Sequence, residues 1–163
     1  MKVGLLSDTH AYWDPCYLDY FKDCDEIWHA GDIGSADVAM RLAAFKPLRA
    51  VCGNIDGYPL RSDYPKVALF EVEGVKVLMT HIGGYPGRYS PEIRKQLYEV
   101  RPRLFISGHS HILKVMFDQQ LGCLHINPGA AGKSGFHQVR TLVRFAIEQG
   151  AVKELEVIEL GNR

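Results

Sequence analysis

The segment KVGLLSDTH, residues 2–10, passes from apolar to polar sequence within a few positions. A short continuous apolar run that ends at turn residues is typical of a strand buried on both faces. Here the apolar run ends at Ser7, and Asp8 and His10 follow it directly. The segment therefore predicts a buried strand with a carboxylate and an imidazole at its carboxyl end.

The same pattern recurs in the segments EIWHA (26–30), LRAVC (48–52), VKVLMT (75–80) and RLFIS (103–107). Each is largely apolar and each is followed by polar residues. Because the carboxyl ends of strands are where open α/β sheets place their sites, we expect these polar side chains to converge in one small volume. The candidate residues are Asp8, His10, Asp32, Asn54, His81, His109 and His111.

Helices and hairpins are predicted between these strands. Apolar residues recur every three to four positions in 36–45, and the segment 90–100 begins with Ser90 as an N-cap. Hairpin turns are predicted at Glu73-Gly74 and near Gln149-Gly150. A βαβαβ start followed by strands mixed with one strong helix predicts an α/β fold of two packed sheets flanked by helices.

Length and composition limit the classes of protein that the chain can represent. With 163 residues, 47% of them hydrophobic, the chain suits a single domain spanning 1–163. Basic and acidic residues balance at 19 each, so nucleic acid is expected only as a substrate. The first apolar run is too short for a signal peptide or a membrane span, and we expect a cytoplasmic protein with no membrane partner.

The cysteine pattern excludes several kinds of site. Cysteine occurs at positions 16, 24, 52 and 123. No two of them form a Cys-x-x-Cys pair, and none fits the Cys-x5-Arg arrangement that a thiol phosphatase uses to hold a phosphate. Zinc-ribbon, thioredoxin and thiol-phosphatase chemistry are therefore not expected. We expect reduced thiols.

The convergence of Asp8 and Asp32 requires a positive counter-charge. Two adjacent carboxylates would repel, and one would be driven toward protonation unless a divalent cation lay between them. Two cations would use the full set of donors, with Asp32 as the bridge. Carboxylate, amide and imidazole donors without a thiolate favour Mn first, with Fe, Zn, Ni and Co as alternatives.

The ordered set resembles the calcineurin-like metallophosphoesterases of the small single-domain type, the YfcE-type phosphodiesterases. It comprises Asp8-x-His10, Gly31-Asp32, Gly53-Asn54, Thr80-His81, Gly108-His109-Ser110-His111 and Asn127-Pro128-Gly129. The resemblance implies a four-layer α/β/β/α sandwich of two mixed sheets, with the metal site at the carboxyl ends of the strands. It also implies hydrolysis of a small phosphodiester by a metal-bridging hydroxide that attacks phosphorus in line.

The resemblance also implies ligand sets and catalytic residues. The first ion would be bound by Asp8, His10, Asp32 and His111, and the second by Asp32, Asn54, His81 and His109. The candidate catalytic residues are Asp32, Asn54 and His109.

Ile55 departs from the family pattern, because many relatives carry a histidine there that assists the leaving group. Since general acid catalysis is typically worth about 10²–10⁴-fold, its loss favours activated or strained diesters. We also expect the loop from Gly83 to Tyr89, which follows His81, to form a lip of the substrate site.

Two other functions remain open at this point. A phosphomonoesterase would need extra cationic groups for the second phosphate charge, and a metal-binding scaffold with this fold would show little turnover. Association of several copies of the chain is also left open. Asp56 is interpreted either as a residue that orients a ligand or as a turn former, His29 as a core histidine, and His125 and His137 as residues without motif partners.

Overall fold

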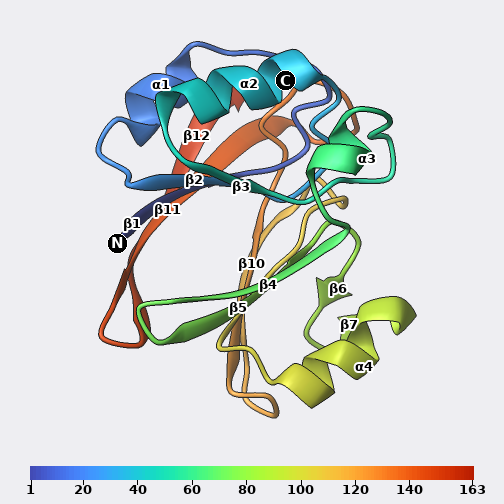
Figure 1. The fold of residues 1–163 in the computed structure, drawn as a ribbon, viewed down its shortest axis with the longest axis vertical. Coiled ribbons are helices and arrows are strands. Elements are labelled where there is room, and N and C mark those ends of the chain that lie inside the picture. The colour runs from blue at the N-terminus through green and yellow to red at the C-terminus, as the bar shows by residue number, and fades with distance from the viewer.

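Two mixed sheets of five strands each lie face to face in the computed structural model, which describes residues 1–163 (Figure 1). The first sheet has the order β12-β11-β1-β2-β3, with β1, β2 and β3 parallel and the β11–β12 hairpin antiparallel beside β1. Its strands are β1 (Lys2–Leu6), β2 (Glu26–His29), β3 (Leu48–Ala50), β11 (Val139–Glu148) and β12 (Ala151–Asn162).

The second sheet has the order β4-β5-β8-β10-β9, in which β5, β8 and β10 are parallel and the two edge strands antiparallel. A small separate hairpin, β6–β7, forms the loop that follows His81. The strands are β4 (Val67–Val72), β5 (Val75–Thr80), β6 (Gly84–Tyr85), β7 (Arg88–Tyr89), β8 (Leu104–Ile106), β9 (Leu113–Asp118) and β10 (Cys123–Pro128).

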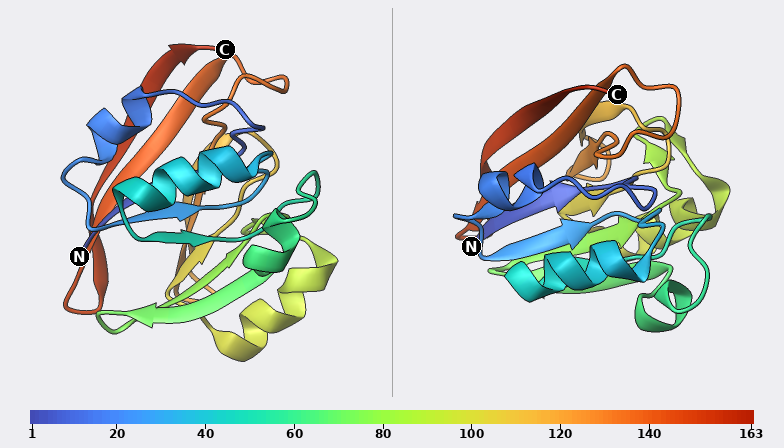
Figure 2. Two further views of the ribbon diagram at one scale, coloured as in Figure 1. Left: turned by 45° about the horizontal axis from the view of Figure 1, so that its top comes forward. Right: turned by 90° about the horizontal axis from the view of Figure 1, so that it is seen from above.

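Helices cover the outer face of each sheet, which gives the molecule four layers (Figures 1 and 2). The first sheet is covered by α1 (Cys16–Phe21) and α2 (Ala36–Phe45), and the second by α4 (Pro91–Val100). A single-turn helix, α3 (Leu60–Asp63), follows β3. The expected α/β/β/α sandwich of two mixed sheets is confirmed.

The cores between these layers explain the continuous apolar runs. Leu5 of β1 belongs to the core between the two sheets, whereas Leu6 belongs to the core under α1 and α2. Trp28 lies between the sheets, edge-to-face with Phe70 and Phe145 at ring centroid distances of 5.0 and 5.7 Å. Because the central strands are buried on both faces, they show no alternation of polar and apolar residues.

The predicted helices at 36–45 and 91–100 and both predicted hairpins are present. At the Glu73-Gly74 turn both residues have a positive φ, 44° and 78°. Ser90 occupies the N-cap of α4, but its hydroxyl donates to the Ile82 carbonyl and makes no capping bond. The helices α1 and α3 and the β9–β10 pair were not predicted, because each is short or lacks a clear period.

The longest helices, α2 and α4, have 10 residues each. No helix in the molecule combines the length and the apolar character needed to cross a membrane.

Candidate metal centre

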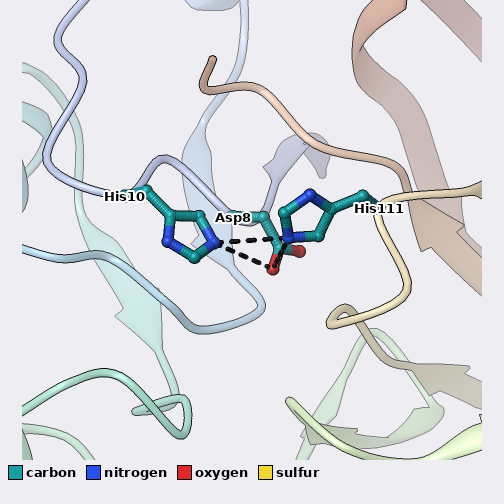
Figure 3. Close-up of side chains that lie close together, drawn as sticks. All are labelled: Asp8, His10 and His111. Carbon is teal, nitrogen blue, oxygen red and sulfur yellow. Dashed lines mark hydrogen bonds and ion pairs between the residues drawn. The ribbon is translucent and has the colours of Figure 1, made fainter. Parts of the chain in front are cut away.

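The loops that follow β1 and β8 bring together Asp8, His10 and His111 (Figure 3). The Nε2 atom of His111 lies 3.1 Å from Asp8 Oδ1 and 3.3 Å from His10 Nε2, and His10 Nε2 lies 3.7 Å from Asp8 Oδ1. The three ligand atoms thus point at one another, from positions that are distant in the sequence. This is a donor set that can hold one cation.

A second group follows β2, β5 and β8 and consists of Asp32, His81 and His109, whose ligand atoms all lie within 4.8 Å of one another. His81 Nε2 is 3.1 Å from Asp32 Oδ2. The two groups adjoin, because Asp32 Oδ2 also lies 3.6 Å from His10 Nε2, and Asp8 Oδ1 lies 3.8 Å from His81 Nε2. Asp32 therefore faces donors of both groups.

Each carboxylate has one oxygen held by hydrogen bonds and one directed at the imidazoles. Asp8 Oδ2 accepts from the Ser7 hydroxyl at 2.6 Å and from the His109 N–H at 3.1 Å. Asp32 Oδ1 accepts from the Ile55 N–H at 3.0 Å. The other oxygens, Asp8 Oδ1 and Asp32 Oδ2, are left for a cation.

Orphaned polar atoms show that the residues fit a bound metal. Asp8 Oδ1 and His81 Nε2 are buried and make no hydrogen bond, although another charged or basic atom of the centre lies 3.1 Å from each. Burying a charged oxygen in this way is costly unless a counter-ion compensates it. His81 Nδ1 lies 2.8 Å from the Ala30 carbonyl, which can only accept, so Nδ1 carries the proton and the Nε2 lone pair faces the centre.

The carboxylates and imidazoles of the centre perturb one another. Burial disfavours charge on Asp8 and Asp32, but the neighbouring histidines outweigh it and hold the pKa of both carboxyls below their usual range. Asp8 raises the pKa of His10, and Asp32 raises the pKa of His81 against the effect of burial. Protons and a metal ion would therefore compete for the same imidazole nitrogens.

The backbone of the centre is strained at most of the candidate ligands. Positive φ angles occur at Asp8 (54°), His10 (47°), Asp32 (51°), His109 (71°) and His111 (59°). Such conformations of residues other than glycine cost on the order of 1–3 kcal/mol each and cluster at functional sites. The strain is consistent with a centre whose geometry is set by function.

The glycine that precedes Asn54 is required by close packing. A Cβ at Gly53 would lie 2.0 Å from Asp32 Oδ1 and 2.3 Å from the Asp32 nitrogen. Only glycine lets the turn after β3 approach the turn after β2 this closely.

Asn54 is the one predicted ligand that the contacts do not tie to the others. It is exposed, and its side chain makes no hydrogen bond to the other candidate ligands. Its carbonyl accepts from Arg61 at 3.2 Å. Its place beside Asp32 follows from Gly53, which packs directly against that carboxylate.

Asp56 proves to be more than a turn former. Its carboxylate is buried and accepts from the N–H groups of Ile33 (3.1 Å), Gly34 (2.8 Å) and Gly53 (2.8 Å). It thus clamps the loop that carries Asp32 to the turn that carries Asn54, and so orients both from outside the centre.

The other three histidines, His29, His125 and His137, differ in their surroundings. His29 is a satisfied core histidine, as interpreted from the sequence, with Nε2 3.0 Å from the Thr9 hydroxyl and Nδ1 accepting from the Gly31 N–H. His125 is buried with no partner for either nitrogen. His137 has no motif partner, as interpreted from the sequence, but it has a partner in space, because its Nδ1 lies 3.3 Å from Nδ1 of His111. No spacing motif in the sequence links these two residues.

A hollow of about 390 Å³ lies against the centre on the side of His109 and His111. Its wall includes Ile112 and Phe136, whose side chains are exposed to 61% and 103% of their reference areas. Exposed apolar side chains therefore border the centre on this side.

Comparison with known proteins agrees with this geometry. Residues 1–150 match the calcineurin-like phosphoesterase superfamily domain. A "Probable metallophosphoesterase" of Methanothermobacter thermautotrophicus is 31% identical over 137 residues, which covers 80% of this chain and 77% of that protein.

Two solved structures share the fold. An archaeal phosphodiesterase superposes with a TM-score of 0.76 at 22% identity, over 98% of this chain and 100% of the other. Vps29 of Entamoeba histolytica, solved in complex with zinc, superposes with a TM-score of 0.74 at 17% identity, over 98% and 99% of the two chains. At these identities the two structures establish the fold alone.

The family match spans most of the chain, and it includes every loop that contributes to the two groups of donors. The chain therefore belongs to the calcineurin-like phosphoesterase superfamily and is a metallophosphoesterase by family.

Proposed function

We propose that this chain is a dinuclear metal-dependent phosphodiesterase that acts on small phosphodiesters. The observation that carries the proposal is the pair of adjoining donor groups, with Asp32 facing both. Asp8, His10, Asp32 and His111 would hold one ion, and Asp32, Asn54, His81 and His109 the other. Mn²⁺ is the preferred ion on the chemistry of these donors, with Fe, Zn, Ni and Co as alternatives.

Two such ions supply a nucleophile at neutral pH and stabilise charge on the phosphoryl oxygens. The chain itself positions the ligands and excludes water from Asp8 and His81, which are buried. Partial desolvation of the ring and the nearby His81 lower the pKa of His109, which favours the neutral form that can bind a cation or contact substrate. Asp32, Asn54 and His109 are the proposed catalytic residues.

The side chains around the centre favour a diester over a monoester. Arg61, which follows the turn that carries Asn54, is bonded to the backbone carbonyls of Gly53, Asn54 and Asp56. These bonds hold the guanidinium against the backbone of the turn, which limits its reach toward the second negative charge of a phosphomonoester. A monoesterase would need a cationic group that is not engaged in this way.

Ile55 defines which diesters would react fastest. Its N–H is bonded to Asp32, and its half-exposed side chain offers no proton to a leaving group. Diesters whose leaving group is a weak base need no such proton. Aryl and strained diesters are therefore the proposed substrates.

The test compares hydrolysis of bis-p-nitrophenyl phosphate and p-nitrophenyl phosphate with Mn²⁺ added and then chelated. Asp32→Asn serves as the blank, because it removes the shared carboxylate. We expect metal-dependent turnover that favours the diester and is absent from the blank. Faster turnover of the monoester would refute the diester assignment, and no turnover with any first-row metal would leave a metal-binding scaffold.

A further inference from the structure

The loop between β10 and β11 brings His137 against His111. The two rings meet edge-on, with centroids 5.2 Å apart and planes at 69°. On its other side, His137 Nε2 lies 2.9 Å from the carbonyl of Gly132. His137 therefore bridges a candidate metal ligand and the backbone of its own loop.

These contacts determine which nitrogen carries each proton. A carbonyl oxygen only accepts, so His137 Nε2 must be the protonated nitrogen that donates to Gly132. In the neutral ring, Nδ1 is then an acceptor, and the group facing it at 3.3 Å, Nδ1 of His111, must donate. His111 Nε2 is consequently left with a free lone pair, directed at Asp8 Oδ1 and His10 Nε2.

The same loop also holds the backbone of Asp8. The N–H of Gly132 donates to the Asp8 carbonyl at 3.1 Å. A Cβ at Gly132 would lie 2.3 Å from the Thr9 carbonyl, and one at Gly135 would lie 2.2 Å from His111 Nδ1. The loop is thus packed against Asp8 and His111, two candidate ligands of one donor group. Within it, His137 links His111 to the carbonyl of Gly132.

We propose that His137 is a positioning residue for the first cation, acting through His111. It fixes the tautomer and the ring orientation of His111 so that Nε2 is ready to bind metal. The proposal rests on the proposed function only in taking His111 as a metal ligand. Loss of such an outer partner typically lowers metal affinity about 10–100-fold.

Two substitutions separate this role from a merely structural one. In His137→Asn, the amide oxygen takes the place of Nδ1 and can still accept from His111, while the bond to Gly132 is lost. In His137→Gln, the amide nitrogen takes the place of Nε2 and can still donate to Gly132, while the acceptor for His111 is lost. Each of the two variants therefore removes one of the two hydrogen bonds of His137 and keeps the other.

The measurement is titration of the metal-free full-length protein with Mn²⁺ by calorimetry, for the wild type and both variants. We expect His137→Asn to bind close to the wild type and His137→Gln to bind one of two ions about 10–100-fold more weakly. The reverse order would show that His137 only anchors its loop, and equal binding by all three proteins would also overturn the proposal. If the wild type binds no Mn²⁺, the proposed metal centre itself fails, which is a distinct result.

A second measurement needs no variant and no metal. Long-range ¹H–¹⁵N spectra of the metal-free protein, at a pH where imidazoles are neutral, report the tautomer of each ring. We expect His111 protonated at Nδ1 and His137 protonated at Nε2. A spectrum with His111 protonated at Nε2 would overturn the proposal.

Discussion

Replacing Asp56 tests whether the clamp between two loops holds the centre together. Its carboxylate accepts hydrogen bonds from three backbone N–H groups. Those of Ile33 and Gly53 donate to Oδ2 and are buried, and that of Gly34 donates to Oδ1 and is partly buried. In Asp56→Ala, all three N–H groups lose their acceptor. The substitution also leaves space unfilled, because Asp56 is 2% exposed.

The magnitude follows from those three bonds. A hydrogen bond to a charged group contributes about 1.5–3 kcal/mol, and the contributions of neighbouring bonds do not add fully. We expect Asp56→Ala to lower the free energy of unfolding by about 3–5 kcal/mol. Asp56→Asn can keep an oxygen at the Oδ2 position and loses mainly the bond to Gly34, so about 1–2 kcal/mol is expected.

The assay is urea unfolding followed by circular dichroism, with a chelator present so that metal binding makes no contribution. Asp63→Ala is the matched control, because Asp63 is an exposed residue of the same segment whose side chain makes no hydrogen bond. The control is expected to stay within about 0.5 kcal/mol of the wild type. A loss below about 1 kcal/mol for Asp56→Ala would refute the clamp, since it is less than one charged hydrogen bond contributes.

Three further outcomes are expected. Because Mn²⁺ binds the folded centre and not the unfolded chain, each bound ion should stabilise the wild type by about 2.7 kcal/mol at about 100 times its Kd, and Asp32→Asn should lose most of this stabilisation in thermal unfolding. The pKa of His10 and of His81 is raised above the ordinary 6.5, so cation binding must release protons from these rings. The Mn²⁺ affinity measured by calorimetry should therefore rise with pH and level off above those pKa values. An affinity that does not change across this range would contradict the expected proton release. Gly53→Ala should abolish Mn²⁺-dependent hydrolysis by displacing the Asp32 carboxylate, whereas Gly57→Ala, whose Cβ would meet nothing within 4 Å, should remain active; equal activities would contradict the packing argument.

Much of the fold was predictable because its signals are local. A strand buried on both faces is apolar throughout, and a helix such as 36–45 shows its period within its own length. The hairpin turns follow from their glycine, which adopts a positive φ without strain, as at Gly150 (76°). Short elements such as α3, with four residues, fall below the length at which a period can be recognised.

The sequence by itself determined the order of the polar residues at the strand ends, and with it the family and the donor chemistry. Only the tertiary structure decided which atoms face the centre and which residues hold them there. Asp56 reaches Ile33 across 23 positions, and His137 reaches His111 across 26. Such contacts depend on how the sheets align the loops that follow their strands, and that alignment leaves no periodic trace in the chain. The strain at Asp8 and Asp32 has the same origin, because the surrounding packing imposes a backbone that neither residue would adopt alone.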